Sequence, residues 1–298
     1  PEEYLPVSAP FNLTYSSRCL PNGVTVLVQT DHRTPVLSFQ TWIAAGSAQD
    51  PGDRTGMAHL FEHLMFKGTE AYPEGAFDRE VEAMGGRTNA ATWLDWTQFY
   101  IDAPAHAFER ILELEFDRFA HLTIDSQRLE NERDVVLNER GEHVDDDPDG
   151  LLTEQLWSMA FGTHPYGQPT IGWEAHIRAI NVADCHAFYR RWYAPERLTI
   201  VIAGDIEADQ AFDAVEARYG VLKPSEWVTE RQTTQQAVPP HEEVIELATG
   251  GERVLLGFRS PEGTHPDNAA LEVLNEILFG GEASRVERAL VIDGELAS

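Results

Sequence analysis

The segment AHLFEHLMFKG, residues 58–68, contains two histidines four positions apart, with a glutamate directly before the second. Its apolar residues recur at helical spacing, which predicts an α-helix. Each residue of a helix turns by about 100°, so His59 and His63 lie about 40° apart on one face, with Glu62 about 60° to the other side of His59. Two imidazoles one turn apart can bind one zinc ion, and a carboxylate beside them can take a proton from a zinc-bound water.

The alternative interpretation is an amphipathic helix that carries these histidines by accident. The chain has 11 histidines, and a chance HxxEH is expected in only about a few such chains per hundred. Most neighbours of the motif are apolar, and histidines on a buried helix need polar partners. A metal is a more economical account than two sets of core hydrogen bonds. The order HxxEH is also a signature of zinc peptidases.

A catalytic zinc site of this kind needs a third protein ligand. A long helix predicted over 125–146 offers five candidates: Glu130, Glu132, Glu139, Glu142 and His143. Glu132 and Glu139 are seven residues apart and share a face, so one could bind the metal while the other orients a ligand. On so charged a helix, any single acidic side chain is expected to face solvent unless other evidence places it in a site. Spacing alone therefore leaves the third ligand open.

The flanking sequence predicts strands and helices in alternation. Strands are expected at 22–32, 36–47 and 197–206, with two more within 87–104, and helices at 77–86, 107–122, 182–193 and 208–220. Residues 223–240 are polar and rich in turn formers, which indicates a linker between a domain at 1–222 and a second unit at 241–298. In that unit, 252–261 resembles a strand and 268–281 a helix. So short a unit is expected to be incomplete.

Composition excludes several classes of protein. The chain has 298 residues and a net charge of −28, from 22 basic and 50 acidic side chains, a field that repels nucleic acid and anionic lipid. No run of 18 apolar residues is present, so no membrane span is predicted. Cys19 and Cys185 form no CxxC pair, which argues against a thiolate zinc site. We expect a soluble protein of the bacterial cytoplasm or periplasm. The acidic surface serves solubility or favours basic peptides.

The segment GMAHLFEHLMFKGT resembles the pitrilysin family of metallopeptidases, because 75 residues separate its last histidine from the first glutamate of NERGE, Glu139. That family includes insulin-degrading enzyme and the mitochondrial processing peptidase. The resemblance implies that His59, His63 and Glu139 bind Zn²⁺ and that Glu62 is the general base. It also implies that Glu132 matches a second glutamate that supports catalysis.

The segment GGRTNAATWLDWTQFY is similar to the strand that lies beside the zinc in this family. The resemblance implies that Asn89 and Ala90 hold the substrate backbone as an added strand, whereas residue type alone favours a turn for Asn89. The implied fold is α+β, a mixed sheet packed with helices, in two related domains of which the second is incomplete here. The implied activity is that of a zinc-dependent endopeptidase or oligopeptidase.

The end of the chain departs from the family pattern. Active single-chain members carry an arginine and a tyrosine seven residues apart, and the comparable stretch VIDGELAS has Val291 and Ser298 there. We therefore expect a homologous partner subunit that supplies both side chains in a heterodimer. The alternatives are a non-catalytic structural or assembly subunit of the same family, and a zinc protein that binds peptides but is inactive without its partner.

Overall fold

The computed structural model describes residues 14–225, 239–247 and 250–296. It divides into two compact units, Pro1–Arg253 and Val254–Ser298, and each is described by itself. Most of the predicted linker at 223–240, and also Ser298, lie outside the described residues. The two-domain division with its linker therefore stays a prediction.

The first unit is built on a six-stranded sheet with the order β1-β2-β6-β3-β5-β4. The strands are β1 (Ser16–Cys19), β2 (Thr25–Thr30), β3 (Val36–Ile43), β4 (Arg87–Thr92), β5 (Thr97–Pro104) and β6 (Leu198–Gly204). Strands β2 and β6 run parallel, and the other neighbours run antiparallel. The predicted mixed sheet is confirmed, and β4 is one of its edges.

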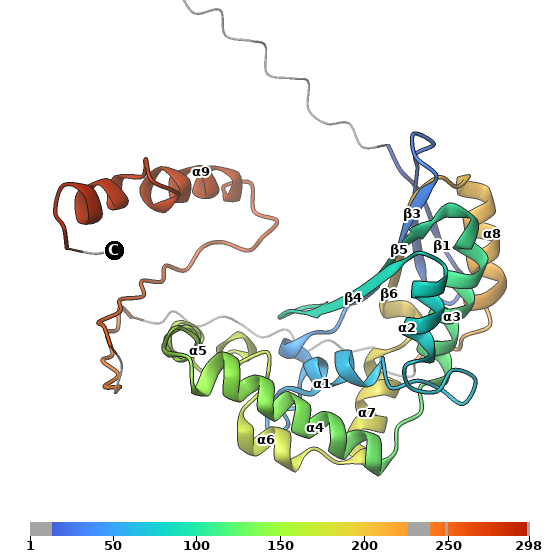
Figure 1. The fold of residues 1–298 in the computed structure, drawn as a ribbon, viewed down its shortest axis with the longest axis horizontal. Helices are drawn as coiled ribbons and strands as arrows, with labels where there is room; N and C mark the ends of the chain where they lie inside the picture. The colour runs from blue at the N-terminus through green and yellow to red at the C-terminus, as the bar shows by residue number, and fades with distance from the viewer. Residues whose placement is uncertain (1–13, 226–238, 248–249, 297–298) are drawn as a thin grey trace, which may run out of the picture. The chain divides into compact units, whose positions relative to one another are not determined.

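Helices follow and separate these strands. They are α1 (Met57–Leu64), α2 (Ala76–Ala83), α3 (Phe108–His121), α4 (Ser126–Arg140), α5 (Pro148–Phe161), α6 (Glu174–Ala179), α7 (Val182–Trp192) and α8 (Ala208–Tyr219). Figure 1 shows α2, α3 and α8 beside the sheet, and α1, α4, α6 and α7 in a second group. The helix predicted over 125–146 changes character within its length, because α4 is followed by a π-helical turn at Gly141–Asp145. No helix in the described ranges has the length and apolarity needed to cross a bilayer.

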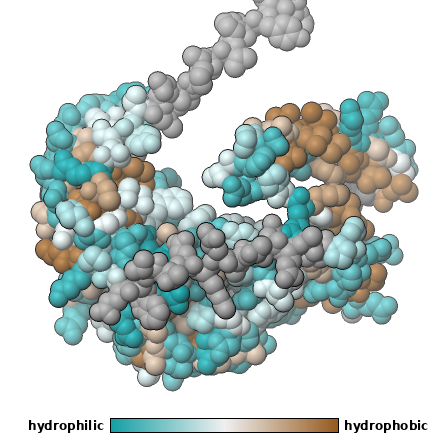
Figure 2. All heavy atoms as spheres, turned by 180° about the vertical axis from the view of Figure 1, so that it is seen from behind, coloured by the Kyte–Doolittle hydropathy of each residue, from teal (hydrophilic) through white to brown (hydrophobic). Residues whose placement is uncertain are grey.

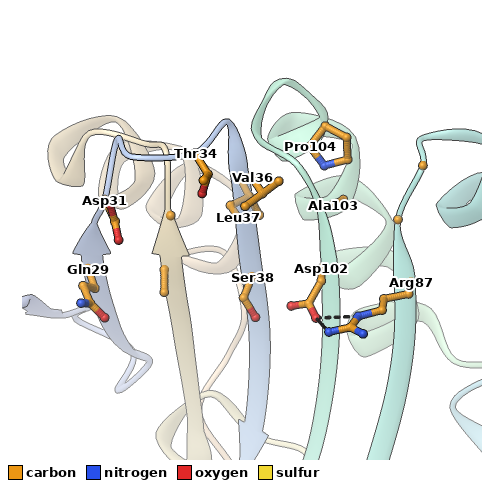
Figure 3. Close-up of a pocket in the computed structure, with 14 residues that line it drawn as sticks. Gln29, Asp31, Thr34, Val36, Leu37, Ser38, Arg87, Asp102, Ala103 and Pro104 are labelled. Carbon is orange, nitrogen blue, oxygen red and sulfur yellow. Dashed lines mark hydrogen bonds and ion pairs between the residues drawn. The ribbon is translucent and has the colours of Figure 1, made fainter.

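The strands alternate between a buried and a half-buried face. Along β5, Phe99 and Ile101 are buried in the core with residues of the helices, whereas Tyr100 and Asp102 are half-buried. This period of two is the pattern of a sheet that is packed on one side only. On the other side the strand ends line a shallow hollow, where Arg87 pairs with Asp102 at 2.9 Å (Figure 3).

The second unit contains α9 (Asn268–Phe279) and a π-helical segment, Glu287–Ile292. Residues 252–261, predicted to be strand-like, form no strand. A strand needs a neighbour to take up its backbone hydrogen bonds, and the described part of this unit has no other strand to pair with. Large apolar side chains are exposed in this unit, including Phe258, Val273 and Ile277. Figure 2 shows this apolar surface in brown.

Candidate metal centre

The helix that carries both histidines is held at its first turn by a carboxylate and a glycine. Asp50 Oδ2 accepts the N–H of Gly56 at 2.7 Å, and Oδ1 accepts that of Ala58 at 2.8 Å, so the carboxylate caps α1. Gly56 has a φ of +88°, and an added Cβ would lie 2.4 Å from the Ile171 carbonyl oxygen. The N-terminus of α1 thus has one position relative to the loop at residue 171.

The opposite helix, α4, turns two glutamates toward these histidines. Its N-cap Asp125 accepts the N–H of Arg128 at 2.9 Å. The buried residues of α4 are Leu129, Glu132, Val136 and Arg140, which recur every three or four positions and form the face that packs toward the core. Because α1 packs against α4, Glu132 and Glu139 reach the histidines of α1.

His59, His63 and Glu139 converge on one point. One ligand atom from each lies within 4.8 Å of the other two. Glu139 Oε1 is 3.7 Å from His59 Nε2, and Oε2 is 3.4 Å from His63 Nε2. Ligands about 2.0–2.1 Å from a tetrahedral zinc ion lie about 3.4 Å from one another, so the spacing fits zinc. Within the described residues, Glu130, Glu142 and His143 take no part in this group.

The two imidazoles differ in their surroundings. Burial lowers the pKa of His59 to about 4, and its Nδ1 is buried with no hydrogen-bond partner in the described part of the chain. Burial also lowers the pKa of His63, but the facing carboxylates of Glu132 and Glu139 outweigh it and raise that pKa to about 9. His59 is therefore neutral, as a metal ligand must be, and zinc would replace a proton on His63.

Glu62 lies between the two histidines in sequence and beside the end of β4 in space. Burial raises the pKa of its carboxyl above the usual value, while Thr92 and His63 act in the opposite direction. A carboxylate with a raised pKa holds a proton more readily at neutral pH, which suits a group that must accept one and then release it. Glu62 is absent from the group of converging ligand atoms.

Glu132 lies behind His63. Its side chain is 4% exposed, with Oε2 3.5 Å from His63 Nδ1 and Oε1 2.7 Å from Lys67 Nζ. Lys67 was not among the site residues predicted from the sequence. Its position four residues after His63 could have indicated it, because residues at this spacing lie close together on a helical turn.

Arg140 directly follows Glu139 and fixes the end of α4. Its side chain is 7% exposed and binds both oxygens of Glu154, at 2.7 and 3.1 Å. It also donates to the Gly172 carbonyl at 2.9 Å. A paired guanidinium fork has one preferred geometry, so Arg140 ties the turn that carries Glu139 to α5 and to the loop at residue 172. No feature of the residue pattern distinguishes Arg140 from its charged neighbours.

Asn89 and Ala90 lie in the middle of β4, which forms an edge of the sheet in the described part of the chain. The interpretation of Asn89 as a turn residue is wrong, because it pairs with Tyr100 of β5 in the ladder. Its side chain accepts the N–H of Ala90 at 2.9 Å. The strand ends at Thr92, beside Glu62. The end of this edge strand therefore lies close to the candidate metal centre.

Sequence comparisons match the chain to two family descriptions. "Insulinase (Peptidase family M16)" matches residues 25–174, and "Peptidase M16 inactive domain" matches residues 179–297. Zinc protease PqqE of Helicobacter pylori is 29% identical over 95% of this chain and 65% of its own length. The bovine cytochrome b-c1 complex subunit 1 is 29% identical over 89% of this chain and 56% of its own.

Among solved structures, a protease from Helicobacter pylori superposes with a TM-score of 0.79 at 26% identity, over 95% of this chain and 69% of that one. The present chain spans less than two thirds of the length of the two curated relatives named above.

Proposed function

Because the chain belongs to the insulinase family, peptidase family M16, we propose that it is the zinc-bearing part of a metalloendopeptidase that hydrolyses peptide bonds. Relatives named zinc proteases support a peptidase-type function. The single observation that carries the proposal is the convergence of His59, His63 and Glu139. Two imidazoles and one carboxylate form a ligand set that suits zinc and leaves a fourth position for solvent. When bound there, zinc would supply Lewis acidity toward water and the scissile carbonyl.

Glu62 is the proposed general base. It accepts a proton from the attacking water and delivers it to the leaving amine. Burial supports this role, because it raises the pKa of Glu62 toward the working pH. Glu132 is proposed to support catalysis through His63, since its carboxylate faces Nδ1 of that ring. A carboxylate partner of this kind fixes the ring orientation and the tautomer of a ligating histidine.

The substrate is proposed to bind as an added strand along β4. Asn89 and Ala90 lie in this edge strand, whose backbone groups can pair with an extended peptide. Because β4 ends beside Glu62, a peptide bound along it would present its backbone to the general base. Such alignment makes the attack of water nearly unimolecular.

A homologous partner subunit is proposed to complete the site. The position that would hold an arginine in active single-chain relatives carries Val291, and the tyrosine position, Ser298, lies outside the described residues. Valine has neither a positive charge nor a hydrogen-bond donor with which to stabilise the charge that develops on the scissile carbonyl oxygen. An arginine and a tyrosine from a partner in a heterodimer would fill this role.

A non-catalytic structural subunit is the second candidate function. The observation in its favour is the similarity to a subunit of the cytochrome b-c1 complex. Against it, a scaffold has no need to keep three ligand-type side chains and the half-buried Glu62 together. A zinc protein that binds peptides but is inactive without its partner lies between the two.

The test compares the wild-type chain with Glu62→Gln. We expect each to bind one equivalent of zinc, and the zinc-loaded wild type to cleave unstructured peptides, alone or in the complex purified from its source. Glu62→Gln should lose about 10²–10⁴-fold in turnover, the usual contribution of a general base. Turnover retained by Glu62→Gln would refute the role of this residue. A zinc-loaded complex from the source that cleaves no peptide would favour the scaffold.

A further inference from the structure

Lys67 lies in the turn that follows α1, four residues after His63, and its ammonium group contacts two carboxylates. Nζ is 2.7 Å from Glu132 Oε1 and 2.8 Å from Glu74 Oε1. The side chain of Glu132 is 4% exposed, whereas that of Glu74 is 59% exposed. Water screens the contact between Lys67 and Glu74. The contact between Lys67 and Glu132 is shielded from water and is therefore the stronger of the two.

The other oxygen of Glu132 faces the metal centre. Oε2 is 3.5 Å from His63 Nδ1, and Nε2 of the same ring is 3.4 Å from Glu139 Oε2. A carboxylate with one oxygen held by an ammonium can offer the other oxygen in only one direction. When Nδ1–H donates to that oxygen, the lone pair of the ring lies on Nε2, on the side of Glu139.

We propose that Lys67 is a positioning residue of the metal centre: it holds Glu132 in the orientation that sets the ring plane and tautomer of His63 for zinc. The inference rests on the proposed zinc site. In it, Lys67 holds Glu132, Glu132 orients His63, and His63 binds the metal. A backbone hydrogen bond holds Lys67 close to the end of α1, because its N–H donates to the Leu64 carbonyl at 2.9 Å and continues the helical turn. One short segment, residues 63–67, therefore supplies both the ligand and the cation that holds its carboxylate partner.

A merely structural role would give a different result. If Lys67 only joined α1 to the residues around Glu74 and Glu132, its loss would lower the melting temperature and leave the affinity for zinc unchanged. If it positions Glu132, the affinity falls because His63 loses its fixed orientation. Zinc affinity, measured apart from activity, separates the two roles.

The experiment measures the zinc dissociation constant of the 298-residue chain by competition with a chromophoric chelator. Partners that directly orient a ligand change metal affinity by about 10–100-fold. Lys67 acts one step further out, so we expect Lys67→Met to weaken zinc binding about tenfold. Lys67→Arg keeps a cation in reach of Glu132 and should recover most of this loss. The matched control is Glu74→Gln, which should leave the constant unchanged because its amide oxygen still accepts from Lys67.

A second measurement reports on the ligand geometry. The absorption spectrum of the Co²⁺-substituted chain should change in Lys67→Met and remain like the wild type in Glu74→Gln. Wild-type zinc affinity in Lys67→Met would overturn the inference, even if that variant melted at a lower temperature. If Lys67→Met does not fold, Lys67→Ala, which also removes the group that contacts Glu132, carries the same test with the same overturning result.

The outcomes separate this inference from the proposed function. A wild-type chain that binds zinc but cleaves nothing, alone or in the complex from its source, would overturn the hydrolase, while the affinity of Lys67→Met still decides the role of Lys67. If Lys67→Met binds zinc as tightly as the wild type, and the wild type cleaves peptides, only the inference about Lys67 is overturned. A wild-type chain without zinc affinity would overturn both.

Discussion

Replacing Arg140 by methionine should destabilise the first unit more than most single substitutions. The change removes a guanidinium that is 7% exposed and leaves the carboxylate of Glu154, 12% exposed, without its bidentate partner. Breaking a buried pair from one side costs about 3–5 kcal/mol, because a buried charge stays uncompensated. The Gly172 carbonyl also loses a donor, which costs about 1 kcal/mol.

The other partner of Arg140 contributes little. Asp145, at 3.1 Å, is 44% exposed, and water can replace the guanidinium there. Glu154 also keeps some access to water, so the low end of the range for a broken pair applies. We expect a loss of about 4 kcal/mol in the free energy of unfolding. In a domain of this size each kcal/mol shifts the melting temperature by about 2–4 °C, and the expected fall is therefore about 10 °C.

The assay is thermal unfolding of the metal-free chain, so that zinc binding does not contribute to stability. Tryptophan fluorescence is a suitable signal, because Arg140 lies 5.8 Å from the ring of Trp173. The double variant Arg140→Met/Glu154→Gln also removes the unpaired carboxylate of Glu154. It should regain about half of the loss in the free energy of unfolding. A single variant that loses less than about 1 kcal/mol, or a double variant no more stable than the single one, would refute the reasoning.

The remaining predictions concern the metal and the thiols. His63→Ala should bind no zinc, because it removes one of three converging ligands, while His143→Ala keeps one equivalent; metal analysis that finds a full equivalent in His63→Ala would exclude His63 as a ligand. Burial raises the pKa of the Cys185 thiol to about 12, whereas Cys19 is exposed, so a disulfide reagent at pH 8 should react with one thiol in the native chain and with two after denaturation. Two fast thiols in the native chain would contradict this burial.

Much of the fold could be predicted from local sequence, and so could α1, the helix that carries His59 and His63. The spacing of Leu60, Phe61 and Leu64 marks the side of α1 that faces the core, and the position of the histidines on that helix follows from its geometry. The edge strand was harder to assign, since Asn89 is a residue type of turns. The strand-like pattern at 252–261 was misleading, because a strand depends on a neighbour that the pattern does not contain.

By itself, the sequence determined most elements of the first unit and the first two candidate ligands, because helical and strand periods are properties of residues that lie within a few positions of one another. Reasoning from the residues left five candidates for the third ligand, since every acid on a helix has the same local geometry. Only the packing of α4 on α1 brought Glu139 to the histidines and Glu132 behind His63. The same packing placed Lys67 against Glu132. Such contacts join residues far apart in the chain, and their distances depend on how whole helices fit together.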